Sequence, residues 1–242
     1  MPFLKELDTK SEPLWKEWDE KANKSGLLHT VYWVNGNEYA GDWVKNKKTG
    51  KGTQKWKNGA VYDGDWKDDK MHGFGTLSIP DKNGGYKRLY AGGWKNGKRH
   101  GYGTQFYPNN ETFEGEWYQD KRSGWGRHYY VDTSVYEGEW YDDMRHGKGM
   151  LRLPNDNRYE GQWLFDKKNG PGSFYYLDKG QLYEGVWKDD IPKCGQMIDY
   201  GRDVASNPTQ YPLSEVKLAD AEGVLDEATN AVLNELEDEN GL

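Results

Sequence analysis

One short aromatic pattern recurs seven times along this chain at nearly constant spacing. Each copy reads aromatic-x-Gly-x-Trp, and its first residue follows that of the preceding copy after 23, 28, 23, 23, 23 and 24 residues. The copies are Tyr39-x-Gly41-x-Trp43, Tyr62-x-Gly64-x-Trp66, Tyr90-x-Gly92-x-Trp94, Phe113-x-Gly115-x-Trp117, Tyr136-x-Gly138-x-Trp140, Tyr159-x-Gly161-x-Trp163 and Tyr183-x-Gly185-x-Trp187. Such regularity is typical of a repeat array, which presents an extended surface rather than a pocket.

Paired glycines follow each of the first six tryptophans at the same distance. The pairs are Gly50/Gly52, Gly73/Gly75, Gly101/Gly103, Gly124/Gly126, Gly147/Gly149 and Gly170/Gly172. In the seventh copy, Cys194 and Gln196 occupy these two places, and residues 30–36 match only the second half of a unit. The array is therefore predicted to begin with a half repeat and to end with a degenerate repeat. We expect an insertion at residues 80–87 to form a longer loop.

The repeated pattern predicts β-hairpins with aromatic rings on one face. Side chains alternate along a strand, so Tyr39, Gly41 and Trp43 share one face, and Ala40 and Asp42 share the other. Glycine is a poor strand residue unless an aromatic ring from the neighbouring strand covers it. The segment after each tryptophan is polar and rich in turn-forming residues, which indicates a hairpin. We therefore predict a ladder of aromatic rings along one sheet face.

These residues resemble the MORN repeat family, whose unit is a Tyr-x-Gly-x-Trp strand, a polar turn with Gly-x-Gly and a second strand. The resemblance covers residues 27–200, and segments 11–18 and 197–203 also resemble the flanks of one family member. It implies an all-β fold, in which tandem hairpins form an elongated, single-layer antiparallel sheet with short N- and C-terminal helices.

Three segments follow from these boundaries. Residues 1–26 form an N-terminal segment with a short capping helix, for which Ser11 can serve as N-cap. Residues 27–200 hold the half repeat and the seven repeats, and residues 201–242 hold a proline-containing linker and an acidic amphipathic helix. The apolar residues at helical spacing are Leu14, Trp15, Trp18 and Ala22 in the first helix, and Val224, Leu225, Ala228, Ala231, Val232 and Leu236 in the second.

Composition excludes several classes of protein. A mean hydropathy of −1.12 argues against a thick aliphatic core, and an aromatic content of 15% argues against disorder, so aromatic rings should provide the burial. Residues 214–242 contain nine acidic residues and one lysine, which leaves the rest of the chain near neutrality and disfavours nucleic-acid binding. A single cysteine, Cys194, and the lack of an apolar leader or span lead us to expect a cytoplasmic protein.

Catalysis, cofactors and metal binding are not expected. Acidic pairs such as Glu114/Glu116 and Glu137/Glu139 recur with the repeat, which indicates a solvated acidic column rather than one catalytic dyad in a cleft. Three histidines occupy one position after the tryptophan, where the other copies have Thr49, Ser123, Asn169 and Lys193, so we predict turn positions rather than metal ligands. They are His72, His100 and His146. The basic residues just before this slot are expected to be solvated, with cation–π contact to a tryptophan as a secondary role.

An aromatic patch is the first candidate binding surface. Repeats two to four carry an aromatic residue between the paired glycines, where other repeats tolerate lysine, and alternation puts two further rings on the same face. The predicted partner-binding patch consists of Phe74, Tyr102, Phe106, Trp125 and Tyr129. Such a patch can anchor a partner. The alternative is that the C-terminal helix covers it.

A lysine cluster is the second candidate surface. It consists of Lys45, Lys47, Lys48, Lys51, Lys55 and Lys57, with no acidic residue between them. Anionic lipid headgroups or an acidic protein would suit this charge. A solvated face and intramolecular docking of the acidic tail are the alternatives.

The combined prediction is a non-catalytic scaffold that holds a partner helix or extended peptide on its aromatic face. One rival is a peripheral membrane adaptor that uses the lysine cluster. Another is a structural protein that forms a homodimer through the seventh repeat, near Cys194. The resemblance implies cytoskeletal or membrane-adjacent assemblies, including cilia, axonemes and sperm flagella, and points to male germ cells.

Overall fold

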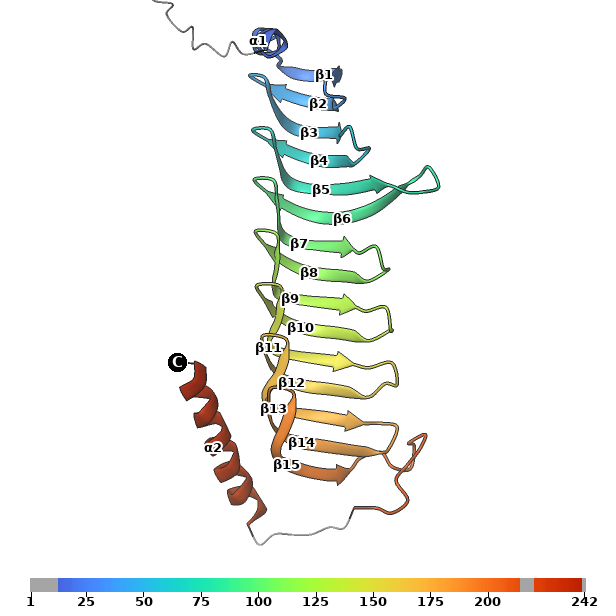
Figure 1. Cartoon of the computed structure of the whole chain (residues 1–242), viewed down its shortest axis with the longest axis vertical. Helices are drawn as coiled ribbons and strands as arrows, with labels where there is room; N and C mark the ends of the chain where they lie inside the picture. Colours follow the sequence, from blue (N-terminus) through green and yellow to red (C-terminus); the bar gives the residue numbers. More distant parts are fainter. Residues whose placement is uncertain (1–12, 214–219, 241–242) are drawn as a thin grey trace, which may run out of the picture. The chain divides into compact units, whose positions relative to one another are not determined.

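The computed structural model describes residues 13–213 and 220–240 and contains one open antiparallel sheet of fifteen strands in sequence order (Figure 1). Helices α1 (Leu14–Lys21) and α2 (Ala221–Asn240) precede and follow the strands in the sequence. The strands are β1 Gly26–Tyr32, β2 Glu38–Val44, β3 Lys47–Lys55, β4 Val61–Lys67, β5 Lys70–Pro80, β6 Tyr86–Lys95, β7 Lys98–Phe106, β8 Thr112–Tyr118, β9 Lys121–Tyr129, β10 Val135–Tyr141, β11 Met144–Arg152, β12 Arg158–Leu164, β13 Lys167–Tyr176, β14 Gln181–Lys188 and β15 Ile191–Asp199. The predicted all-β class and antiparallel sheet are confirmed.

The chain divides into two compact units. The first comprises residues 1–88 and 93–98, and the second comprises residues 89–92 and 99–242. The first therefore contains α1 and strands β1 to β5, and the second contains β8 to β15, α2 and all of β7 except Lys98. Strand β6 contributes residues to both units. The insertion at residues 80–87 lengthens β5 and β6 around a short turn, so the prediction of a longer loop is wrong.

Tight turns close the hairpins after each tryptophan. The two central residues of the β10–β11 turn, Asp142 and Asp143, have φ values of 52° and 72°. Positive φ at both positions is the type I′ geometry that matches the twist of paired strands, and aspartate and asparagine tolerate it better than most residues. The polar segments predicted to be turns therefore form them.

A β-bulge follows the turn in the hairpins β2–β3, β4–β5, β8–β9, β10–β11, β12–β13 and β14–β15, and it explains some of the recurrent acids. Between β10 and β11 the register shifts after Gly138, and Gly147 adopts a φ of 60° beside the Glu139 carboxylate. Glu139 Oε1 accepts a hydrogen bond from the Lys148 backbone N–H at 3.2 Å. Glu139 thus satisfies a backbone group of the bulge, as Asp42 and Asp65 do in other repeats. Glu137 of the predicted acidic column instead pairs with the Arg127 side chain. His146 lies in the bulge within β11, so the predicted turn position of this histidine slot is wrong.

The core is an aromatic ladder, as predicted. Tyr136 is completely buried, and its ring centroid lies 5.2 Å from that of Trp140 and 5.3 Å from that of Trp163, with both ring pairs nearly perpendicular. The Tyr136 ring covers Gly138 and Gly149 on the paired strands. We call the face that bears these rings the ladder face and the other the opposite face. The buried ladder residues are Tyr39, Trp43, Tyr62, Trp66, Tyr90, Trp94, Phe113, Trp117, Tyr136, Trp140, Tyr159, Trp163 and Trp187.

Polar contacts hold the end of α1 within the first unit. Asn46, in the β2–β3 turn, donates its side-chain amide to the Glu20 carbonyl at 2.6 Å, and the Lys24 ammonium bonds to Asp19 at 2.7 Å. Leu14 and Trp18 are exposed, although we expected them on a packing face. Ser11, the predicted N-cap, lies outside the described residues. In the second unit, α2 contacts β14 and β15.

Candidate protein-binding surface

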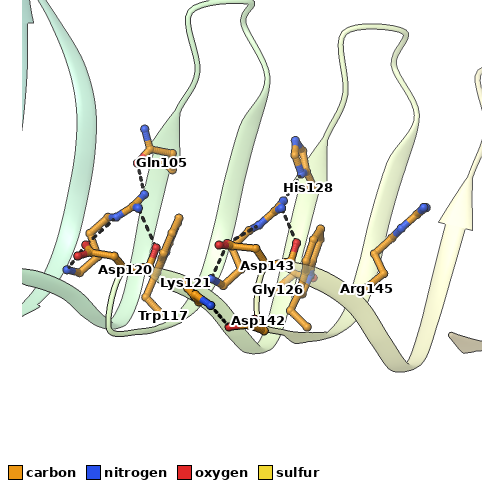
Figure 2. Close-up of polar contacts among 12 residues, drawn as sticks. Gln105, Trp117, Asp120, Lys121, Gly126, His128, Asp142, Asp143 and Arg145 are labelled. Atoms are coloured by element: carbon orange, nitrogen blue, oxygen red, sulfur yellow. Dashed lines mark hydrogen bonds and ion pairs between the residues drawn. The ribbon is translucent and has the colours of Figure 1, made fainter. Parts of the chain in front are cut away.

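The ladder face carries a column of basic side chains that link successive hairpins (Figure 2). The Arg122 guanidinium lies 4.1 Å from the centroid of the Trp140 ring and donates to the Asp143 carbonyl at 2.6 Å. The Asp143 carboxylate accepts the Arg122 backbone N–H at 2.9 Å, and the Asp143 N–H donates to the Arg122 carbonyl at 3.1 Å. Each turn is thereby fastened to the strand of the preceding repeat.

The same arrangement recurs where the sequence led us to expect solvated charges. Arg99 and Arg145 pair with aspartates and lie over tryptophans of the next repeat. Lys48 and Lys168 take this place in other repeats, and desolvation lowers the pKa of both ammonium groups. The expected cation–π contact is therefore confirmed, but it accompanies partial burial rather than full solvation. The three arginine pairs are structural, because each guanidinium already has an aspartate partner.

His128 is a buried polar residue that the sequence analysis missed. Its ring stacks on Tyr130 with centroids 4.3 Å apart, and its Nδ1 accepts a hydrogen bond from Arg122 Nη1 at 3.0 Å. Nε2 therefore carries the proton and donates to Glu111 at 3.2 Å. Burial, followed by the positive charge of Arg122, lowers the pKa of His128. Two residues before Tyr130, it shares the ladder face with Gly126, and strand alternation from that glycine could have located it.

Acidification is expected to destabilise the second unit through His128. Because its folded-state pKa lies below the unfolded value of about 6.5, the unfolded chain binds more protons as the pH falls through that range. Stability is therefore highest above about pH 6.5 and decreases towards the folded-state pKa. His128→Gln should remove this loss, because Gln105 accepts Arg99 Nη1 at 2.8 Å in the corresponding place. Urea unfolding of both proteins at about pH 7.5 and 5.5 tests this, and equal losses would contradict it.

The opposite face exposes large aromatic rings in the second unit. Tyr102 is 56% exposed and Trp125 is 50% exposed, and they occupy equivalent places on β7 and β9. Phe106 and Tyr129 lie on the same face, four residues further along these strands. Phe106 is half-buried, and Tyr129 is 37% exposed. Since α2 contacts β14 and β15, it leaves these rings accessible. The second unit thus brings together four of the five residues of the predicted patch.

Hydrogen bonds orient the tyrosines of this surface. The Tyr102 hydroxyl donates to Glu114 Oε1 at 2.9 Å. Arg127 donates to the Tyr129 hydroxyl at 3.2 Å and pairs with Glu137 at 2.7 Å. Such contacts reduce the side-chain entropy that a partner would otherwise have to remove on binding.

A shallow groove of about 590 Å³ begins at Trp125 and continues across β11 and β12. Gly149 and Gly161, which have no side chains, are among the residues that line the groove. Its other lining residues are Trp125, Glu137, Lys148, Met150, Glu160, Gln162 and Pro171. The exposed ring of Trp125 therefore stands at the edge of a depression that has both apolar and charged walls.

Phe74 belongs to the first unit, where it is 68% exposed on the opposite face of β5. Its backbone N–H donates to the Asp65 carboxylate at 2.9 Å, as expected for the residue that follows the bulge glycine. Phe74 thus lies on the predicted face and is exposed to solvent.

The predicted lysine cluster is divided between the two sheet faces. Lys48 lies on the ladder face over the Trp66 ring, whereas Lys51 lies on the opposite face and pairs with Asp65 at 2.6 Å. Lys47 pairs with Asp68 at 3.5 Å. The other members are Lys45 in the β2–β3 turn, Lys55 at the end of β3, and Lys57 in the turn that follows. The six ammonium groups therefore do not form one continuous basic surface.

The degenerate seventh repeat still folds as a hairpin, made of β14 and β15. Cys194 pairs with Val186 across these strands and is half-buried. Within residues 13–213 and 220–240, no group of three or more His, Cys, Asp or Glu side chains is arranged to hold a metal ion. No helix in the described part of the chain is both long and apolar enough to cross a membrane.

Comparison with known sequences agrees with the repeat boundaries. The family model described as MORN repeat matches residues 39–61, 62–84, 90–112, 113–135, 136–158 and 159–181. The six matches begin at the first aromatic residue of the first six copies. The seventh copy falls outside them, as its missing glycine pair would suggest.

Full-length relatives show the same similarity. The chain is 69% identical to MORN repeat-containing protein 3 of Bos taurus, with 94% of this chain and 95% of the relative covered. It is 68% identical to the Homo sapiens protein of that name over the same shares. With the Xenopus laevis protein of that name it shares 57% identity over 98% of this chain and all of the relative.

Proposed function

Because the chain belongs to the MORN repeat family, we propose that it is a non-catalytic adaptor that holds partner proteins on the opposite face of its sheet. The observation that carries this proposal is the half-exposed pair Tyr102 and Trp125, which stands where other repeats carry Lys51, Lys148 or Pro171. The fold does not need an aromatic side chain at this place, since lysine and proline are compatible with it. Exposed tyrosine and tryptophan are common anchors of protein interfaces.

The proposed setting is a cytoskeletal assembly, in cilia or in the flagella of male germ cells. Resemblance to the family is the sole support for this setting. It determines which tissue should be tested first.

The experiment is proximity labelling and pull-down from ciliated or germ-line tissue with the wild type and a Tyr102→Ala/Trp125→Ala variant. We expect specific loss of one or a few partners from the variant, because truncating both rings removes two anchors, each worth about 1–2 kcal/mol or more. Circular dichroism and thermal unfolding must first show that the variant is folded.

Tyr118→Ala/Tyr141→Ala is the matched control. These tyrosines are 57% and 59% exposed but lie at strand ends, outside the patch. Their removal should leave the partner list unchanged. If both double variants retain every partner, the aromatic patch is not the docking surface.

A further inference from the structure

We infer that the segment docked on the opposite face is proline-rich and basic, and that it runs across the strands as a polyproline II helix. This inference rests on the proposed function and specifies its partner. It follows from the spacing of the exposed rings, the charge around them and a free hydrogen-bond donor.

The spacing of the repeat matches the polyproline II helix. Tyr102 and Trp125 are equivalent residues on β7 and β9, so two inter-strand steps, about 9.6 Å, separate their backbones. Three residues of polyproline II rise about 9.3 Å and return to the same side of the helix. An extended strand also rises about 10 Å in three residues, but its third residue points to the other side. An α-helix needs seven residues, which rise about 10.5 Å, to return to the same side. Its rise therefore departs further from the distance between equivalent residues of the array, and the difference accumulates from repeat to repeat.

The charge of the surface favours a basic ligand. Along 102–106, 112–116, 125–129 and 135–139, the outward positions carry four glutamates and Arg127, which is a net charge of −3. The glutamates are Glu114, Glu116, Glu137 and Glu139. Glu114 lies beside Tyr102, whose hydroxyl donates to Glu114 Oε1 at 2.9 Å, so a bound arginine can reach a carboxylate and a ring face together. This charge also disfavours α2, which contains no lysine or arginine.

A free donor completes the match. Trp125 is half exposed, and within the described residues its indole N–H makes no hydrogen bond. Polyproline II leaves its backbone carbonyls unpaired, and such ligands bind in aromatic-lined grooves. The groove that runs from Trp125 past Met150 to Pro171 offers an apolar continuation for the proline rings.

Fluorescence anisotropy with labelled twelve-residue peptides tests the inference on the full chain. The probe is four repeats of Arg-Pro-Pro, with Glu-Pro-Pro repeats and a helical peptide carrying arginine every seven residues as comparisons. We expect the wild type to bind the Arg-Pro-Pro probe more tightly than either comparison peptide. The affinity for this probe should be at least about tenfold lower in Tyr102→Ala/Trp125→Ala. It should be about three- to tenfold lower in Glu114→Gln/Glu137→Gln. Tyr118→Ala/Tyr141→Ala should bind like the wild type.

Three results would overturn the inference. They are tighter binding of the helical peptide, equal binding of the acidic peptide, and Arg-Pro-Pro affinity that is unaffected by loss of Tyr102 and Trp125. If cellular partners still depend on these two rings, the adaptor proposal survives any of these results. If cellular partners do not depend on them, the adaptor proposal itself fails.

Discussion

Replacing Gly149 by alanine is expected to destabilise the second unit by about 3 kcal/mol. A Cβ atom at this position would lie 2.3 Å from the Tyr136 hydroxyl oxygen and 2.6 Å from Cζ of the same ring. The ring cannot move aside, because it is fully buried between Trp140 and Trp163. Urea unfolding monitored by tryptophan fluorescence measures the loss.

Gly85→Ala is the control for this prediction. Gly85 lies in the turn between β5 and β6, where an added Cβ atom would meet nothing within 4 Å. Its replacement should change stability by less than about 0.5 kcal/mol. The clash itself is isolated by a double-mutant cycle with Tyr136→Ala, in which Gly149→Ala should cost much less. If the cost is unchanged in that background, the steric explanation is wrong.

Truncation of the ring should have a similarly large effect. Tyr136→Ala is expected to lower the free energy of unfolding by about 4 kcal/mol, because it opens a cavity and removes two edge-to-face contacts with tryptophans. The same urea titration tests this. Hydrogen exchange should also show reduced protection in the neighbouring repeats, since repeats in an array stabilise one another.

Tyr136→Phe separates the ring from its hydroxyl. The hydroxyl donates to the Glu139 carbonyl at 3.0 Å, so its loss should cost about 1 kcal/mol. Phe113 occupies the equivalent place naturally and is equally buried, which shows that the unit accommodates a phenyl ring. Equal losses for alanine and phenylalanine would assign the stability to the hydroxyl and contradict the ladder as its main source.

Some side-chain contacts form between strands of different repeats, and the sequence did not predict them. Arg122 looked like a solvated turn residue, yet it reaches Asp143, 21 positions later, and stacks on Trp140. Lys48 and Lys51 looked like one cluster, but Lys48 lies over the Trp66 ring and Lys51 pairs with Asp65 of the next strand. A long side chain has several rotamers of similar energy, and contacts with the next repeat select among them.

The amino-acid sequence is enough to predict the hairpin unit, its seven positions and the face that each aromatic residue occupies. These properties are local: strand alternation has a period of two, and glycine recurs wherever a ring must approach the backbone. The folded structure was needed to learn how far each ring of the patch is exposed, which charges are paired, and that His128 is buried beside Arg122. Exposure and pairing depend on atoms brought together from separate repeats, and the spacing of residues along one strand does not specify them.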